Sequence, residues 1–282
     1  MNFLRKRVQK WLERTYSYNL KTEKNVLTEF HTKLLNIFFH NDKCMTPSYT
    51  IYYWPIAIRG NFVRVLLAYA GVLYAEAPIS ELGALRALPV NEQPYPSMAP
   101  PFLHDLEEDV FLSQTASIVH YLGNKLKLFP DSNQKVSLCL KIMLDANDVM
   151  SELTQGSQGG PWKEEGFQKF IDGRFVKWLS IFEEGGIRHG LSEDDGYYLG
   201  TESPSVADLV VFSLWNTMER CLPALSPILR TKAPRVLALC DRLAAMPNLS
   251  AFIKKQEEVL GNRYCSPGME PSLRKVINLL SS

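Results

Sequence analysis

Residues 99–123 read APPFLHDLEEDVFLSQTASIVHYLG and determine the fold prediction, because they contain two strands, a turn and a helix in that order. The run that ends at Asp105 favours a strand, the polar residues 106–109 favour a turn, and Val110-Phe111-Leu112 favours a second strand. Gln114 to Leu122 has apolar residues at helical spacing and is followed by a glycine. The stretch therefore predicts a β-hairpin followed by a helix.

A strand–helix–strand unit precedes this hairpin. Thr50 to Tyr53 is β-rich, Phe62 to Ala70 has apolar residues on one helical face, and Val72 to Ile79 can return as a strand. Two strands joined in this way by a helix must run parallel. A connection rich in proline then leads into residue 99 and cannot be regular helix at its prolines. The first half of the chain thus reads βαβ and then ββα.

After Pro130 the pattern indicates helices alone, and a domain boundary is expected near this proline. Ser205 and Asp208 have the spacing of a capping box, in which both residues satisfy free backbone donors at a helix start. The expected helical stretches are residues 139–153, 167–182 with a stop at Gly185-Gly186, 205 onward, 232–245 and 248–260.

The composition of the chain counts against several classes of function. The chain has 282 residues, enough for two domains, and its 31 Lys and Arg nearly balance 30 Asp and Glu, so nothing attracts it to nucleic acid or an anionic membrane. Its most hydrophobic run, Ala207 to Trp215, is too short to span a bilayer. The five cysteines include Cys44, form no CxxC pair and lack metal-ligand spacing, which favours reduced thiols and disfavours a redox dithiol enzyme.

The first 49 residues begin with a segment that is more basic than the rest of the chain. Met1 to Lys24 holds seven Lys or Arg, with apolar residues at helical spacing. Two interpretations stay open: a surface helix or loose extension, which is favoured, and a transit segment for an organelle. Two glutamates and a single serine in this segment count against the transit interpretation.

Several motifs, in their order and spacing, resemble the soluble glutathione S-transferases, closest to the tyrosine-type classes, from Thr50 to about Leu260. These motifs are Tyr53-Trp54-Pro55 with Arg59-Gly60, Ala99-Pro100-Pro101-Phe102, Ser113-Gln114-Thr115, Pro204 to Asp208, and Met246-Pro247-Asn248-Leu249. The resemblance implies an α+β thioredoxin-like domain followed by an all-helical domain. We accordingly expect an extension at 1–49, a glutathione-binding domain at 50–127 and a helical domain at 128–282.

The resemblance further implies an enzyme that conjugates the glutathione thiolate to small, largely apolar electrophiles, with glutathione as cosubstrate and no metal. It also implies a homodimer, a cytoplasmic location and a role in detoxification. The alternative is a non-catalytic interaction or ligand-binding module of the same fold. Glutathione-dependent isomerisation or peroxide reduction would use the same thiolate, and the sequence does not separate these activities.

Tyr53 is the catalytic residue that the resemblance implies, because a hydroxyl donor ends the first strand and Ile56, Ala57 and Ile58 offer none. Tyr52 points to the opposite face of a regular strand. The loop from Tyr53 to Arg59 is about two residues longer than usual in the family, so Arg59 or Asn61 stays open as a substitute donor.

The other residues that the resemblance assigns to glutathione are Trp54, Arg59, Ala99, Pro100, Gln114 and Thr115. A cis bond between Ala99 and Pro100 would present the backbone of Ala99 to the cysteinyl part. Gln114 and Thr115 open a helix whose free N–H groups favour the γ-glutamyl carboxylate.

Three large residues are candidates for the pocket of the second substrate: Met150, Trp162 and Tyr197. Arg64 is expected to form a structural ion pair facing the second domain.

Overall fold

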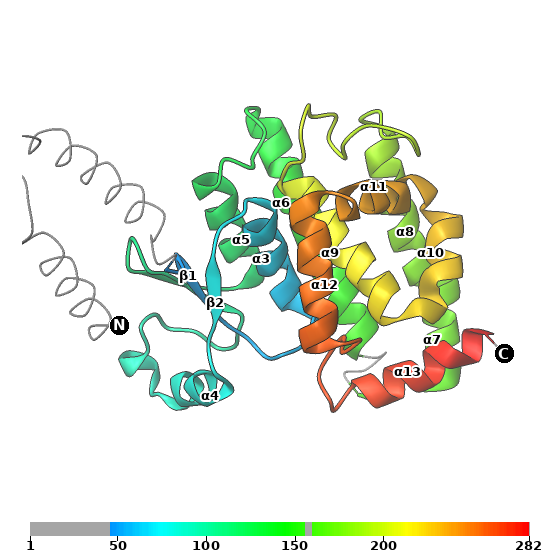
Figure 1. Cartoon of the computed structure of the whole chain (residues 1–282). Helices are drawn as coiled ribbons and strands as arrows, with labels where there is room; N and C mark the ends of the chain where they lie inside the picture. Colours follow the sequence, from blue (N-terminus) through cyan, green and yellow to red (C-terminus); the bar gives the residue numbers. More distant parts are fainter. Residues whose placement is uncertain (1–45, 156–159, 282) are drawn as a thin grey trace, which may run out of the picture. The chain divides into compact units, whose positions relative to one another are not determined.

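The computed structural model describes residues 46–155 and 160–281 (Figure 1). The basic segment Met1 to Lys24 and Cys44, on which the sequence raised questions, lie outside the described residues. From Pro47 onward the chain forms one compact unit.

One mixed sheet of four strands, in the order β2-β1-β3-β4, forms the first part of this unit. The strands are β1 (Tyr49–Tyr52), β2 (Tyr74–Glu76), β3 (Phe102–Asp105) and β4 (Val110–Ser113). Strand β1 pairs in parallel with β2 and antiparallel with β3, and β3 and β4 form the hairpin. The predicted parallel pair and the predicted hairpin are both confirmed.

The other regular elements of the described chain are helices. They are α3 (Ile58–Tyr69), α4 (Ile79–Ala87), α5 (Thr115–Lys125), α6 (Asn133–Gln155), α7 (Glu164–Phe170), α8 (Val176–Ile187), α9 (Val206–Cys221), α10 (Ser226–Lys232), α11 (Pro234–Ala244), α12 (Pro247–Leu260) and α13 (Glu270–Asn278). Short turns of other helix types are η1 (Val90–Glu92), η2 (Ile171–Phe175), η3 (Pro223–Leu225) and η4 (Leu279–Ser281). The expected fold class, a small α+β part followed by helices alone, is confirmed.

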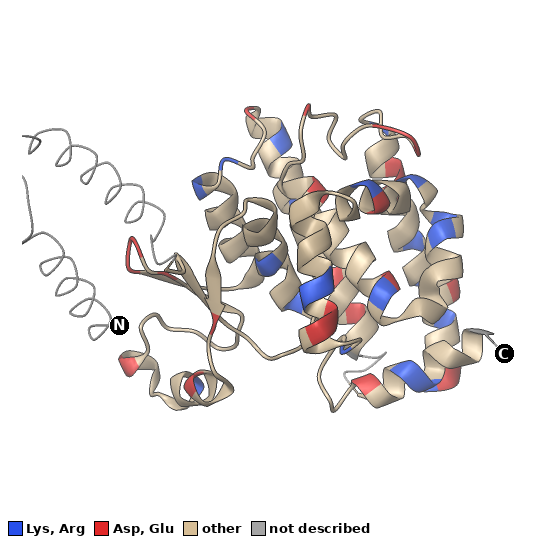
Figure 2. Cartoon of the chain, in the orientation of Figure 1, with Lys and Arg blue, Asp and Glu red and all other residues tan. Residues whose placement is uncertain are grey.

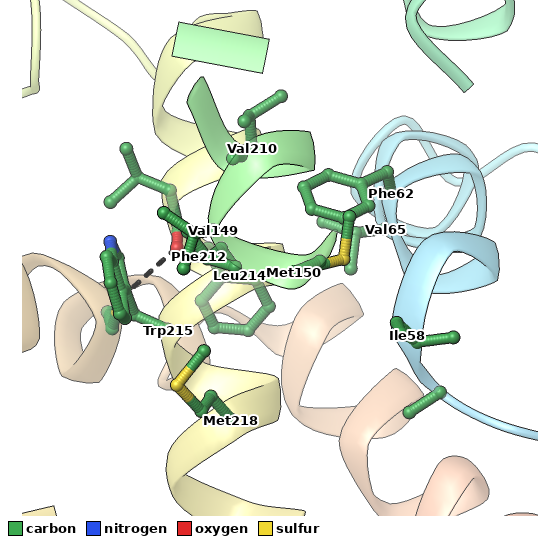
Figure 3. Packing of buried hydrophobic residues seen from close by; sticks show 14 of the residues in the cluster. Ile58, Phe62, Val65, Val149, Met150, Val210, Phe212, Leu214, Trp215 and Met218 are labelled. Atoms are coloured by element: carbon green, nitrogen blue, oxygen red, sulfur yellow. Dashed lines mark hydrogen bonds between the residues drawn. The ribbon is translucent and has the colours of Figure 1, made fainter. Parts of the chain in front are cut away.

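One cluster of buried hydrophobic residues includes side chains of both the sheet part and the helical part. Helix α9 is buried at every residue from Val206 to Met218, and it contacts α3, α6 and α11. Figure 3 shows Phe62 of α3 beside Met150 of α6, with side chains of α9 close by. Helix α12 also contacts α3 (Figure 1). Helix α3 therefore packs against helices that lie more than 100 residues later in the chain.

The predicted capping box at α9 is present, and its acid is fully buried. Asp208 accepts hydrogen bonds from the Ser205 N–H at 2.8 Å and from the Tyr198 N–H at 2.7 Å. One carboxylate thus satisfies backbone donors of the helix start and of the preceding loop.

The predicted helix stop at Gly185-Gly186 is wrong, because α8 continues through both glycines to Ile187. The glycines serve close packing instead. A Cβ at Gly185 would lie 2.5 Å from Tyr198 Oη, and one at Gly186 would lie 2.5 Å from Leu191 Cδ2. Helix α4 and helix α13 were not anticipated from the sequence.

Charged residues of both signs are spread over the helices rather than gathered by sign (Figure 2). In the described part of the chain, no single helix has both the length and the apolar character to cross a membrane; only α11 and α12 taken together, bent by 92° at their junction, meet those two criteria.

Candidate active site

Tyr53 directly follows β1 and is 4% exposed. Its ring packs edge-on against Trp54, with ring centroids 5.3 Å apart, and lies over the backbone of Gly60, where a Cβ would come within 2.5 Å of Tyr53 Cδ1. Tyr52 instead packs against Phe111 and lines a separate cavity on the other side of the sheet. The two adjacent tyrosines therefore line different cavities.

Tyr53 lines a cavity of about 740 Å³ between the end of β1 and the C-terminal part of the chain. The wall on the first side comes from the loop after Tyr53 and from the start of α3, and the opposite wall comes from residues between Arg263 and Arg274. Apolar groups dominate this lining, among them Trp54, Ile56, Met269 and Pro271. Such a cavity suits an apolar ligand that meets a few polar groups.

The Tyr53 hydroxyl stays protonated at neutral pH. Burial raises the pKa of Tyr53 to about 12, although the charges of Arg59 and Arg64 and a hydrogen bond from the Arg59 backbone N–H oppose this shift. Because the oxygen accepts that backbone bond, its own proton is available for another acceptor. Tyr53 can therefore donate a hydrogen bond to an anion in the cavity.

Arg59 is the second polar group of this wall. Its Nε donates to Asn147 Oδ1 at 3.2 Å and a terminal nitrogen donates to Ser151 Oγ at 2.7 Å, both on α6. Both partners are neutral, so the guanidinium keeps its positive charge uncompensated by these contacts. It adds a positive potential to the side of the cavity that holds Tyr53.

Asn61 is not brought to the cavity. It is 2% exposed, and its side chain donates to Thr217 Oγ1 at 3.1 Å and accepts from Arg64 at 3.3 Å. These contacts use both ends of its amide inside the core. Of the two loop donors left open by the sequence, only Arg59 lines the cavity.

Arg64 forms a structural ion pair, as expected, but the expected partner in the second domain is wrong. Its guanidinium pairs with Glu76 of β2 in the sheet part, with Nε 2.6 Å from Oε1. The sequence contains no spacing pattern that would have linked this arginine to a glutamate on a short strand.

The predicted cis bond between Ala99 and Pro100 is also wrong, because the cis bond lies between Pro100 and Pro101. Two successive prolines leave this choice open in the sequence, and Pro100 is buried while Ala99 is exposed. Residue 100 offers a carbonyl acceptor but no backbone N–H. It therefore cannot provide both hydrogen bonds that were expected of Ala99.

Gln114 and Thr115 stand at the start of α5 as expected. Gln114 is exposed and has φ 69° and ψ 116°, a conformation that costs a non-glycine residue about 1–3 kcal/mol. Its side chain caps nothing in α5, whereas Thr115 is buried. The strained residue and the free N–H groups behind it form a surface able to hold a carboxylate. Neither residue lines the cavity beside Tyr53.

The candidates for the second substrate pocket lie elsewhere. Met150 is buried in the core (Figure 3), Trp162 donates its indole N–H to Leu153 O at 2.6 Å, and Tyr197 does not line the cavity. The second wall comes instead from a segment beyond Leu260, where the sequence resemblance ended.

This C-terminal segment is fixed to the loop after β1 by two backbone hydrogen bonds. The N–H of Ala57 donates to Arg263 O and the N–H of Ile58 donates to Tyr264 O, each at 3.1 Å. The carboxylate of Glu270 accepts from the N–H groups of Tyr264 and Cys265. Only a run of apolar residues at helical spacing near the chain end could have indicated this element.

Cys265 lines the cavity but is not an activated thiol. Burial raises the pKa of Cys265 to about 12, so the sulfur stays protonated and is a poor nucleophile. Within residues 46–155 and 160–281, no group of three or more His, Cys, Asp or Glu side chains is placed to hold a metal ion.

Comparison with known proteins finds one matching family model and several related proteins. The family described as "Glutathione S-transferase, C-terminal domain" matches residues 138–276. Hematopoietic prostaglandin D synthase of Gallus gallus is 26% identical over 215 residues, covering 74% of this chain and 97% of that protein. Glutathione S-transferase P of Homo sapiens is 24% identical over 223 residues, covering 76% and 95%.

Solved structures share the fold. The Pi-class glutathione S-transferase of Onchocerca volvulus aligns with a TM-score of 0.61 at 17% identity, over 75% of this chain and 94% of that one. Rat hPGDS in complex with a quinoline aligns with a TM-score of 0.58 at 21% identity, over 74% and 97%.

Proposed function

Because the chain belongs to the soluble glutathione S-transferase family of enzymes, we propose that it conjugates glutathione to small, largely apolar electrophiles. The observation that carries this proposal is a protonated, buried Tyr53 hydroxyl in the wall of an apolar cavity of about 740 Å³. Glutathione is the cosubstrate, and its sulfur forms the new bond to carbon.

Tyr53 acts as the donor to the sulfur. A thiol of pKa about 8.5 is only about 3% ionised at pH 7, and lowering that pKa by two units requires about 2.7 kcal/mol. A phenol donor together with a nearby guanidinium can supply this amount, since a hydrogen bond to a charged group contributes about 1.5–3 kcal/mol. Tyr53 supplies the hydrogen bond, and Arg59 supplies the positive potential.

The glutathione site extends from Tyr53 over the surface of the sheet part, residues 50–127. The γ-glutamyl carboxylate binds at the start of α5, at Gln114 and Thr115, where the first N–H groups of the helix have no intrahelical acceptor and no side-chain cap. The peptide passes the Ala99–Pro100 segment, and Trp54 and Arg59 lie at the thiol end. The apolar electrophile enters the cavity between Trp54 and the C-terminal segment of the helical part, 128–282.

Several further properties of this proposal follow the family. We infer a homodimer, a cytoplasmic location and a role in detoxification, as in a conjugating enzyme of this kind. Glutathione-dependent isomerisation would use the same thiolate and is a second activity to be assayed.

A second candidate is a non-catalytic ligand-binding module. The observation in its favour is the C-terminal segment, which is anchored beside Tyr53 by the bonds from Ala57 and Ile58 and forms one wall of the cavity. If this wall keeps the glutathione sulfur away from Tyr53, the chain binds apolar ligands without conjugating them.

One experiment separates the two. Glutathione binding is measured by calorimetry, and conjugation of a generic aromatic electrophile is measured across pH, for wild type, Tyr53→Phe and the control Tyr52→Phe, whose ring lies in the other cavity. We expect Tyr53→Phe to bind glutathione within about twofold but to lose 10²–10³ in kcat, as removal of a preorganised anion donor does. Its pH profile should move upward.

The control Tyr52→Phe should keep both the rate and the pH profile. A wild type that binds no glutathione refutes the enzyme proposal and leaves the ligand-binding module. Equal rates and pH profiles for Tyr53→Phe and wild type refute the role of Tyr53.

A further inference from the structure

Arg64 of α3 has a side chain that is only 2% exposed, and each of its N–H groups has an acceptor. On one side it forms a two-point contact with Glu76, from Nε to Oε1 at 2.6 Å and from a terminal nitrogen to Oε2 at 3.1 Å. This fork fixes the plane of the guanidinium relative to β2.

The other side of the same guanidinium holds the loop that follows Tyr53. Arg64 donates to Ile56 O at 2.8 Å and to Trp54 O at 3.4 Å, and it also donates to Asn61 Oδ1 at 3.3 Å. Trp54 O and Ile56 O belong to a segment that has left the sheet and has not yet entered α3. These bonds therefore replace the ladder bonds that the segment lacks.

The guanidinium also contacts the tyrosine itself. Its Cζ lies 5.7 Å from the centroid of the Tyr53 ring, within the range of a cation–π contact. Both groups meet over Gly60, where a Cβ would come within 2.6 Å of an Arg64 terminal nitrogen. Arg64 thus contacts both the Tyr53 ring and the backbone of the loop that follows it.

We propose that Arg64, held by Glu76, is a positioning residue that sets the orientation of the Tyr53 hydroxyl toward the bound thiol. It does not touch the thiol, since it does not line the cavity. The kinetic part of this proposal rests on the proposed function, and the structural part does not. A lysine cannot replace the arginine, because a single ammonium cannot reach both carboxylate oxygens and two loop carbonyls.

The test compares Arg64→Lys, Glu76→Gln and a matched control, Arg230→Lys. Arg230 also forms forked pairs, with Glu219 and Asp241, but on α10. The first measurement is hydrogen exchange of the amides from Tyr53 to Ile58, which needs no ligand. The second is kcat, KM for glutathione and the pH profile of conjugation.

For Arg64→Lys we expect faster exchange in the loop with unchanged exchange in α9. We also expect a fall in kcat of about tenfold or more, with KM for glutathione within about twofold and an upward shift of the pH profile. Glu76→Gln should change the same quantities in the same direction but less, since the carbonyl contacts remain. Arg230→Lys should match wild type in all of them.

Unchanged loop exchange in both variants overturns the proposal, and so does a rise in KM with unchanged kcat. If Arg64→Lys does not fold, Glu76→Gln decides alone, because its carboxylate is partly exposed and its loss leaves the loop contacts in place. If wild type does not conjugate glutathione, the proposed function fails, while the exchange data still decide whether Arg64 holds the loop of Tyr53.

Discussion

Replacing Gly60 with alanine tests the packing of the candidate site with a single methyl group. The new Cβ would lie 2.5 Å from Tyr53 Cδ1 and 2.6 Å from a terminal nitrogen of Arg64. Real Cβ atoms do not approach other atoms this closely, so the Tyr53 ring or the guanidinium must move. Neither can move freely, because Tyr53 is buried against Trp54 and Arg64 is held by Glu76.

The expected change in stability is small because two effects oppose each other. Adding a methyl group to a packed core costs about 1–3 kcal/mol, whereas alanine in place of glycine within a helix contributes about 0.5–1 kcal/mol. The net result is a loss of about 0–2.5 kcal/mol in the free energy of unfolding. The expected change in rate is larger, because displacing a catalytic group by about 1 Å can cost about 10²-fold.

Urea unfolding and conjugation kinetics measure the two effects in the same preparation. Gly83→Ala is the matched control: it lies within α4, a Cβ there meets nothing within 4 Å, and it should stabilise by about 0.5–1 kcal/mol with full activity. A Gly60→Ala protein that is both more stable than wild type and fully active would refute the reasoning on the Tyr53 environment.

Two further predictions concern stability. Asp208→Ala should cost about 2–4 kcal/mol by urea unfolding, because it leaves the buried N–H groups of Ser205 and Tyr198 without an acceptor; a cost below 1 kcal/mol would contradict the capping role. The raised pKa of Tyr53, about 12 against 10.0, means that the folded state holds its proton longer than the unfolded state, so stability falls as pH rises from 10 to 12. Tyr53→Phe should remove about 2–3 kcal/mol of that fall, and an unchanged alkaline slope would count against a buried phenol.

The fold could be predicted from the sequence because its signals are local. The hairpin and the capping box at Ser205 depend on residues within a few positions of one another, and each strand and helix of the βαβ unit has its own pattern within one short stretch. The glycine pair at 185–186 led to a wrong prediction. A glycine is found both where a helix ends and where a helix packs closely, as here against Tyr198 and Leu191, and the sequence does not distinguish the two cases.

The site could be predicted only on its first side. Tyr53 and Arg59 lie near the end of the first strand, where the sequence placed them, and both line the cavity. The partners of Arg64 and the wall from Arg263 to Arg274 depend on contacts between distant segments, for which one sequence gives no spacing. The prediction placed the cis bond one residue too early. The sequence does not indicate which of two successive prolines, Pro100 or Pro101, follows the cis bond.

The backbone bonds from Ala57 and Ile58 to the C-terminal segment also bear on biosynthesis. The loop beside Tyr53 is translated before the residues that face it across the cavity, which lie between Arg263 and Arg274. A ribosome-bound chain that has completed the whole sheet therefore still presents an open groove instead of a cavity. We expect that apolar ligands gain a complete binding surface only once the polypeptide through Arg274 has left the ribosome.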